Sequence, residues 1–312
     1  MPPKVLVICG PTATGKTALS VELALRHGGE VVSADSMQVY RRMDIGTAKA
    51  TAEEMRGVPH HMLDVAEPDE DFSVARYVDM AGRCVDDILS RGKLPILVGG
   101  TGLYLDSLLS GRRFAAFTGE TRLKLQRRAE EEGITPLWEE LKAIDPQRAA
   151  KLPLADGKRI LRALEVYYET GKTITQHDEE DAVRPPRYEA LTLVLSFADR
   201  ADLHRRIDER VDEMMARGLE QEVRALLAEG VPAKCTAMQA IGYKELAAAI
   251  QTGGDVGQAA AEVKLRSRQY AKRQLTWFRR NQEAKWLLWG KTPDFQQAIQ
   301  NSTHYMEEFG LS

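Results

Sequence analysis

Residues 10–17 of this chain read Gly10-Pro11-Thr12-Ala13-Thr14-Gly15-Lys16-Thr17. An apolar run precedes them at residues 5–9, and the composition of residues 18–25 favours a helix. A strand, a glycine-rich loop and a helix with the spacing G-x-x-x-x-G-K-[ST] are typical of a phosphate-binding loop. The glycines let successive backbone N–H groups turn toward one anion, and the lysine and the helix N-terminus add positive charge. The segment therefore predicts a parallel α/β sheet with a site for at least a diphosphate.

The composition limits the class of protein. The chain has 312 residues, enough for one large domain or two modest ones, and 43 Lys and Arg against 46 Asp and Glu give a net charge of -3. A nucleic-acid function must therefore depend on local clustering of charge. The three cysteines lie far apart, which disfavours structural zinc and a disulfide framework. No stretch approaches the roughly 18 apolar residues of a membrane helix, so we expect a soluble, cytoplasmic protein with no membrane partner.

Two further strand ends carry polar side chains. A predicted strand at residues 30–34 leads into Asp35, and another at 94–98 leads into a glycine cluster that contains Thr101. The carboxyl ends of parallel strands line the ligand crevice, so Asp35 and Thr101 are candidates to face the phosphate loop. Each also has a structural alternative, which is to cap the helix that follows. The residues alone leave both alternatives open.

The pattern changes near Arg112. Strand signals disappear, and charged helical segments follow until strand character returns at residues 191–195. Two strand-bearing regions around a helical block predict an insertion. We expect a P-loop catalytic core formed by residues 1–112 and 190–312, and a helical insertion domain at 113–189. The fold class is α/β, a P-loop-containing parallel sheet flanked by helices.

The C-terminal region contains a basic helical segment. Residues 263–282 carry no acid, and the aromatic residues Tyr270, Trp277 and Phe278 are interleaved with seven cations. The cations are Lys264, Arg266, Arg268, Lys272, Arg273, Arg279 and Arg280. A solvated helix face is the usual explanation of such a run. In an acidic protein, however, the cluster is also a local electrostatic footprint for a polyanion.

Hydrolysis-driven machinery is disfavoured. A P-loop NTPase usually holds Mg²⁺ with an acid at the end of an apolar strand. Here the strand at 94–98 ends in glycines, and the later strand reaches Asp199 only after Ala198. A transferase remains, in which Asp35 orients or deprotonates an acceptor. The loop could hold ATP for a small-molecule kinase, or an organic diphosphate whose far end is the electrophile, because the loop recognises only phosphates.

The motifs in order resemble the tRNA dimethylallyltransferase family. The match begins with residues 10–17, Asp35 to Tyr40 and Asp44 to Lys49. It continues through 59–61, 97–104, 159–166, 240–245 and 268–279, and so spans nearly the whole chain. The resemblance is to the bacterial form, which lacks the zinc-finger tail of eukaryotic relatives.

This resemblance implies a prenyltransferase. The dimethylallyl group of dimethylallyl diphosphate would go to N6 of adenosine 37 in tRNAs that read codons beginning with U, forming i6A37 and releasing diphosphate. Lys16, Asp35 and Thr101 would be the catalytic residues, with Asp35 as general base. The diphosphate would be bound by Gly10, Pro11, Thr12, Ala13, Thr14, Gly15, Lys16 and Thr17, with Mg²⁺ on Thr17 as cofactor.

The resemblance also implies the tRNA contacts. The target base must leave the stack of the anticodon loop and enter the crevice. Asp35, Ser36, Met37, Gln38 and Thr101 would contact this base. The insertion would bind the anticodon stem-loop through Arg159, Ile160, Leu161 and Arg162, and the basic helix would add phosphate contacts. Arg210 is a further candidate to lie near the diphosphate, and we expect a monomer.

Three other functions compete with this interpretation. They are a P-loop small-molecule kinase, an RNA-binding regulator with a nucleotide switch, and an adenylate isopentenyltransferase that makes free cytokinin. The long helical insertion and the basic helix exceed what a small acceptor requires, and Asp35 favours an enzyme over a regulator. Transfer to tRNA is therefore the preferred hypothesis.

Overall fold

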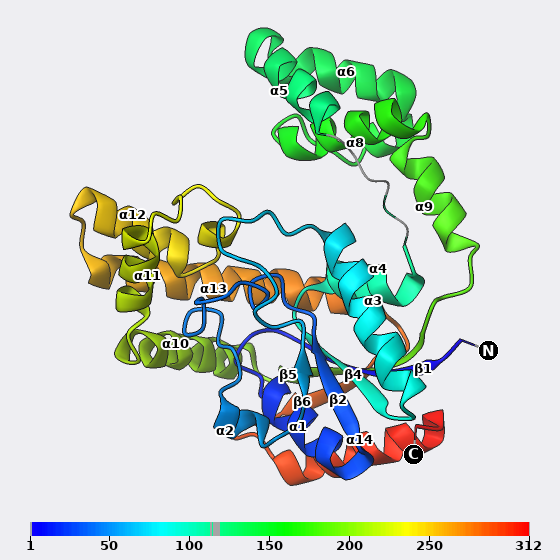
Figure 1. The fold of residues 1–312 in the computed structure, drawn as a ribbon, viewed down its shortest axis with the longest axis vertical. Helices are drawn as coiled ribbons and strands as arrows, with labels where there is room; N and C mark the ends of the chain where they lie inside the picture. The colour runs from blue at the N-terminus through cyan, green and yellow to red at the C-terminus, as the bar shows by residue number, and fades with distance from the viewer. Residues whose placement is uncertain (1, 113, 115–118, 312) are drawn as a thin grey trace. The chain divides into compact units, whose positions relative to one another are not determined.

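A computed structural model describes residues 2–112, 114 and 119–311, and its centre is a six-stranded sheet in the order β3-β2-β4-β1-β5-β6 (Figure 1). The strands are β1 (Lys4–Cys9), β2 (Gly29–Ser33), β3 (His60–His61), β4 (Leu94–Gly99), β5 (Glu189–Phe197) and β6 (Lys285–Trp289). Neighbouring strands pair in parallel throughout. The predicted fold class is thus confirmed. Only β3 was not predicted, because two residues are too few to show a periodicity.

Strand β1 lies in the interior of the sheet, between β4 and β5, and its residues 5–9 are buried. Leu6 and Ile8 belong to the core that includes residues of α1 (Lys16–His27) and α14 (Phe295–Phe309). Val7 and Cys9 point to the other face, as alternation along a strand requires, and line a cavity of about 300 Å³ together with residues of the helices there. Both faces of the sheet are therefore covered, as is usual for a parallel sheet.

The strand order brings three loops together. β2 pairs with β4 and β4 pairs with β1, and the registers Ser33↔Val98 and Cys9↔Gly99 show that these strands end at about the same level. The segments after β1, β4 and β2 therefore emerge side by side. They carry the phosphate loop, Thr101 and Asp35.

The remaining helices of this unit surround the sheet. They are α2 (Ala52–Met55), α3 (Val74–Ser90), α4 (Gly102–Ser110), α10 (Arg200–Ala216), α11 (Leu219–Ala228), α12 (Tyr243–Thr252) and α13 (Val256–Phe278), with a 3-10 turn at Ala237–Gln239. Helix α3 illustrates the sequence signals, since Ser73 accepts a hydrogen bond from the Arg76 backbone N–H and Tyr77, Val85 and Ile88 are buried on one face. None of the described helices is long and apolar enough to cross a membrane.

The chain divides into two compact units, one of residues 1–111 and 187–312 and one of residues 112–186. The second unit contains α5 (Glu120–Glu132), α6 (Ile134–Ile144), α7 (Pro146–Ala149), α8 (Gly157–Thr170) and α9 (Ile174–Ala182). It has its own hydrophobic core, which includes Leu125, Leu137, Leu141, Ile160 and Leu164. The sequence put the insertion boundaries at 113 and 189, within three residues of this division.

Candidate active site

The phosphate loop depends on its glycines. Gly10 and Gly15 have positive φ angles of 141° and 81°. A Cβ atom at Gly10 would lie 2.2 Å from the Leu195 carbonyl oxygen, and one at Gly15 would lie 2.7 Å from the Phe295 ring. A side chain at either position would therefore be strained and would also clash. Ala13 adopts a positive φ of 65° without this freedom, so the surrounding contacts must stabilise its conformation.

Two hydrogen bonds fix the middle of the loop. The Thr14 hydroxyl donates to the Pro11 carbonyl oxygen at 2.9 Å, and the Trp289 indole N–H donates to the Thr14 carbonyl oxygen at 2.8 Å. Trp289 lies on β6, far along the chain. The loop is thus braced from outside its own motif, which leaves its N–H groups preorganised for an anion.

Two cations and one carboxylate meet at this loop. Burial lowers the pKa of Lys16 to about 8, the positive charge of Arg210 lowers it further, and Asp35 acts in the opposite direction. Burial also lowers the pKa of Arg210, and Asp35 is among the acids that counteract this. The Lys16 ammonium donates to the Pro11 carbonyl oxygen at 2.7 Å. A dianionic ligand in the loop would compensate both desolvated cations. Arg210 was only a weak candidate in the sequence because no motif surrounds it.

Asp35 combines its two predicted roles. Its Oδ1 accepts hydrogen bonds from the backbone N–H groups of Met37 at 2.9 Å and Gln38 at 3.4 Å. Its Oδ2 accepts no hydrogen bond from any residue that the structure describes. One oxygen therefore shapes the turn and the other is available to a ligand. Thr101 does not cap α4 with its side chain but accepts at 3.1 Å from the Ser36 N–H, which joins the ends of β4 and β2.

Helix α13 adds two groups that the sequence did not assign to the site. Burial raises the pKa of Tyr270 to about 12, the charge of Asp35 raises it further, and a hydrogen bond with Thr101 lowers it. The Gln274 side chain donates to the Gly100 carbonyl oxygen at 2.9 Å. Its Oε1 is buried and has no hydrogen-bond partner within the described parts of the chain. The sequence indicated only that this helix is basic and aromatic.

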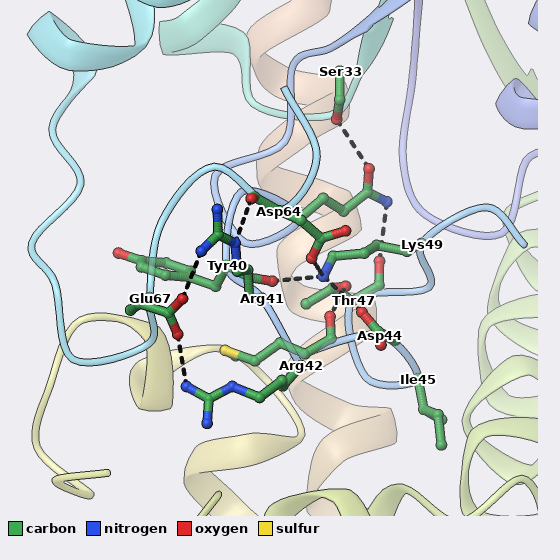
Figure 2. Close-up of polar contacts among 12 residues, drawn as sticks. Ser33, Tyr40, Arg41, Arg42, Asp44, Ile45, Thr47, Lys49, Asp64 and Glu67 are labelled. Atoms are coloured by element: carbon green, nitrogen blue, oxygen red, sulfur yellow. Dashed lines mark hydrogen bonds and ion pairs between the residues drawn. The ribbon is translucent and has the colours of Figure 1, made fainter. Parts of the chain in front are cut away.

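The loop after Asp35, residues 36–49, is tied together by one buried ammonium group. The Lys49 side chain is 6% exposed, and its Nζ donates to Asp44 at 2.7 Å, to Asp64 at 2.6 Å and to the Tyr40 carbonyl oxygen (Figure 2). All three ammonium hydrogens are thereby used. Arg42, within this loop, has a positive φ of 63°. The 36–49 loop is thus a strained segment that its contacts stabilise.

Gln38 belongs to the interior of this loop. Its amide donates to the carbonyl oxygens of Thr47 at 3.1 Å and Ala48 at 3.3 Å, and its Oε1 accepts from the Ser33 hydroxyl at 2.9 Å. Both amide hydrogens are therefore used within the loop. A base contact by this side chain would have to use the remaining lone pair of Oε1.

Glu222 on α11 holds the far side of the same loop. Its carboxylate accepts from the backbone N–H groups of Asp44 and Ile45 at 2.9 Å each and of Gly46 at 3.2 Å, and it also accepts from the Tyr243 hydroxyl. A Cβ atom at Gly46 would lie 2.4 Å from the Tyr243 ring. The loop is thus pressed against α11 and α12. No sequence signal distinguishes Glu222 from the other acids of its helix.

The four residues predicted to bind tRNA from α8 differ in exposure. Arg159 and Arg162 are exposed and pair with Asp156 at 2.7 Å and Glu165 at 2.8 Å. Ile160 is 0% exposed and Leu161 is 8% exposed, and both belong to the core of the second unit. The prediction that Ile160 and Leu161 contact tRNA directly is therefore wrong for this conformation. They lie on the inward face of α8 and support the exposed arginines by packing.

The residues present are compatible with a metal ion held chiefly by the ligand. The described residues contain no group of three or more His, Cys, Asp or Glu side chains that could bind a metal. The Thr17 hydroxyl, in the first turn of α1, has no hydrogen-bond partner among the described residues. Mg²⁺ commonly uses few protein ligands together with phosphate oxygens and water, and Thr17 fits that pattern.

Comparison with known proteins gives one consistent family. The family model "IPP transferase" matches residues 38–281. The tRNA dimethylallyltransferase of Acetivibrio thermocellus is 43% identical and covers 98% of each chain, and that of Desulforudis audaxviator is 47% identical and covers 92% of each.

Solved structures give the same result. A full-length tRNA isopentenylpyrophosphate transferase from Bacillus halodurans has a TM-score of 0.72 and 39% identity, covering 98% of this chain and 97% of that one. A eukaryotic dimethylallyltransferase acting on tRNA has a TM-score of 0.84 and 31% identity, covering 98% of this chain and 80% of that one. These likenesses extend over both compact units.

Proposed function

Because the chain belongs to the IPP transferase family, we propose that it transfers the dimethylallyl group of dimethylallyl diphosphate to N6 of adenosine 37 in tRNA. The tRNAs would be those that read codons beginning with U, the base product i6A37, and the second product diphosphate. The observation that carries this proposal is the convergence of Lys16, Arg210 and Asp35 at the ends of adjacent strands. This arrangement puts groups for an anionic leaving group beside a carboxylate for an acceptor. We expect such an enzyme to act as a monomer in the cytoplasm.

The glycine loop would bind the diphosphate. Its N–H groups, the N-terminus of α1, Lys16 and Arg210 would stabilise the charge that builds up on the departing group. Lys16 would exchange its hydrogen bond with the Pro11 carbonyl oxygen for one with the diphosphate. Because both cations are desolvated in the free protein, their attraction for the leaving group is strong.

Mg²⁺ would be held by the Thr17 hydroxyl and by diphosphate oxygens, which fits the sparse protein ligands of this site. The ion would supply further neutralising charge to the leaving diphosphate.

The acceptor side would use Asp35. The bond between N6 and the allylic carbon forms as the carbon–oxygen bond breaks, and the electron pair of that bond leaves with the diphosphate. The proton lost by N6 would go to Asp35 Oδ2, the oxygen that the turn does not use. The adenine must first leave its stack. The flipped base would then lie against Thr101, Ser36 and Met37.

The second unit would bind the anticodon stem-loop. Exposed Arg159 and Arg162 of α8 are its candidate phosphate contacts, although each must share its charge with an acid of the same helix. The size of this unit, with five helices among its described residues, favours a macromolecular acceptor over a nucleotide.

One labelling experiment tests the function. Purified protein, Mg²⁺ and radiolabelled dimethylallyl diphosphate are incubated in parallel with tRNA, AMP or ATP. We expect label only in tRNA that carries A36-A37-A38. Label in AMP or ATP would instead indicate an adenylate isopentenyltransferase, and phosphate transfer from ATP without prenyl transfer would indicate a kinase.

A further inference from the structure

Helix α13 carries two different charge environments. In its N-terminal half, each of three cations is paired with an acid, and two of these acids lie on the neighbouring helix α10. The pairs are Lys264–Asp212 at 2.6 Å, Arg266–Glu262 at 2.6 Å and Arg268–Asp208 at 2.5 Å. The acid-free run of the sequence is thus neutralised here by residues that the run does not contain.

The C-terminal half of α13 and the turn after it are different. Lys272, Arg273, Arg279 and Arg280 are all exposed, and none has a carboxylate within 4.0 Å in the part of the chain that the structure describes. Of these four, Arg280 has a longer-range attraction to Asp106. The unpaired positive charge of the helix is therefore concentrated at one end.

Aromatic rings fix the orientation of two of these cations. The Arg273 guanidinium lies over the Tyr270 ring at 5.4 Å, and the Arg280 guanidinium lies over the Trp277 ring at 4.9 Å. Trp277 is itself fixed, because its indole N–H donates to Asp106 at 2.9 Å. Stacked guanidinium groups keep their outer N–H donors free for phosphate oxygens and lose little conformational entropy on binding.

These side chains border an open groove of about 400 Å³. Its lining residues are Gln269, Lys272, Arg273, Thr276, Trp277 and Arg280. No acid lines it among the described residues. A surface of cations, amide and hydroxyl groups around an indole ring is suited to a nucleic-acid backbone and its bases.

The groove begins beside the reactive centre. Tyr270, which supports Arg273, is hydrogen-bonded to Thr101 and lies within the electrostatic reach of Asp35. One turn further along, Gln274 is bonded to the Gly100 carbonyl oxygen. A strand of RNA that delivers a base to Asp35 would therefore pass this helix with its neighbouring nucleotides.

We propose that the α13 groove binds the sugar-phosphate backbone of the nucleotides that flank the acceptor adenosine. This inference rests on the proposed function, because it takes tRNA as the acceptor. It assigns RNA contact to the unpaired end of α13 and withdraws it from the paired end. The diphosphate of the prenyl donor is a different ligand and occupies the glycine loop.

The test compares two double variants of the full chain that remove the same net charge. Lys272→Ala with Arg273→Ala changes the groove, and Lys264→Ala with Arg266→Ala changes the paired half. The Kd for tRNA is measured by fluorescence anisotropy over a salt series. Two lost phosphate contacts should weaken binding by about tenfold and lower the slope of log Kd against log salt by about two. The control variant should keep the wild-type slope and a Kd within about twofold, because its cations are already neutralised.

Equal effects of the two double variants would overturn the groove, since net charge alone would then explain them. A raised KM for dimethylallyl diphosphate with an unchanged Kd for tRNA would also overturn it and would assign the groove to the donor. Thermal melts of both variants exclude a folding defect. If the wild-type protein prenylates tRNA and the slopes do not differ, only the groove fails. If it prenylates no tRNA, the proposed function fails.

Discussion

The phosphate loop and the 36–49 loop both follow strands of the same sheet, yet they are stabilised differently. The phosphate loop uses glycine at two of its three positive-φ positions, so its shape is encoded in its own residues. The 36–49 loop has positive φ at Arg42 and Ala48, where no glycine relieves the strain. Its shape depends on Lys49 within the loop and on Glu222 far along the chain. One loop is therefore readable from the sequence, and the other becomes visible only in the fold.

This difference suggests a division of labour that variants can break or sharpen. If the phosphate loop serves the prenyl donor and the 36–49 loop serves the acceptor, changes in one should alter the kinetics of one substrate only. Asp35 lies between them and should affect the chemical step itself.

The largest effect is expected for Asp35→Asn. Asparagine retains an oxygen to accept the Met37 N–H but cannot take a proton from N6, so the turn should survive while general-base catalysis is lost. We expect kcat to fall by about 10³-fold, with the Kd for tRNA within about twofold of wild type. Single-turnover transfer of label and anisotropy measure these two quantities. Wild-type turnover in this variant would remove Asp35 from the chemical step.

Sequence reasoning predicted the strand ends, because hydrophobic runs and glycine clusters are local signals. It found Lys16, Asp35 and Thr101 in this way, and the sheet order brings their segments together. It did not find Glu222 or Tyr270, because each acts on a partner more than a hundred residues away. The acids that neutralise half of α13 were missed for the same physical reason, since charge on a helix is balanced by its neighbours in space.

The next effect is expected for Lys16→Met, which keeps the length of the side chain and removes its charge. Loss of one preorganised cation at the leaving group should lower kcat/KM for dimethylallyl diphosphate by about 10²-fold. The Kd for tRNA, measured without donor, should stay unchanged. A weakened Kd for tRNA of similar size would contradict the division between the loops.

A smaller effect follows from the titration of Lys16. Burial lowers its pKa to about 8, so the free protein carries the positive charge below that pH and loses it above. Affinity for dimethylallyl diphosphate should therefore fall by up to about tenfold between pH 7 and 9. Affinity for the donor is measured by calorimetry at each pH. Lys16→Arg should flatten the profile because arginine stays charged, and a wild-type profile that is already flat would disprove this role of Lys16.

The smallest effect, and the sharpest test of the second loop, is expected for Glu222→Gln. Its carboxylate accepts from the N–H groups of residues 44–46, and a glutamine amide would turn an NH₂ group toward at least one of these donors. Losing about 1 kcal/mol of hydrogen bonding should lower kcat/KM for tRNA by about fivefold, without changing the Kd for the donor. Glu220→Gln is the matched control, because Glu220 lies on the same helix and pairs only with Arg224 among the described residues. A purely structural role would lower the melting temperature and affect both substrates alike, whereas a loss confined to tRNA, partly restored by Glu222→Asp, would mean that α11 sets the position of the acceptor loop.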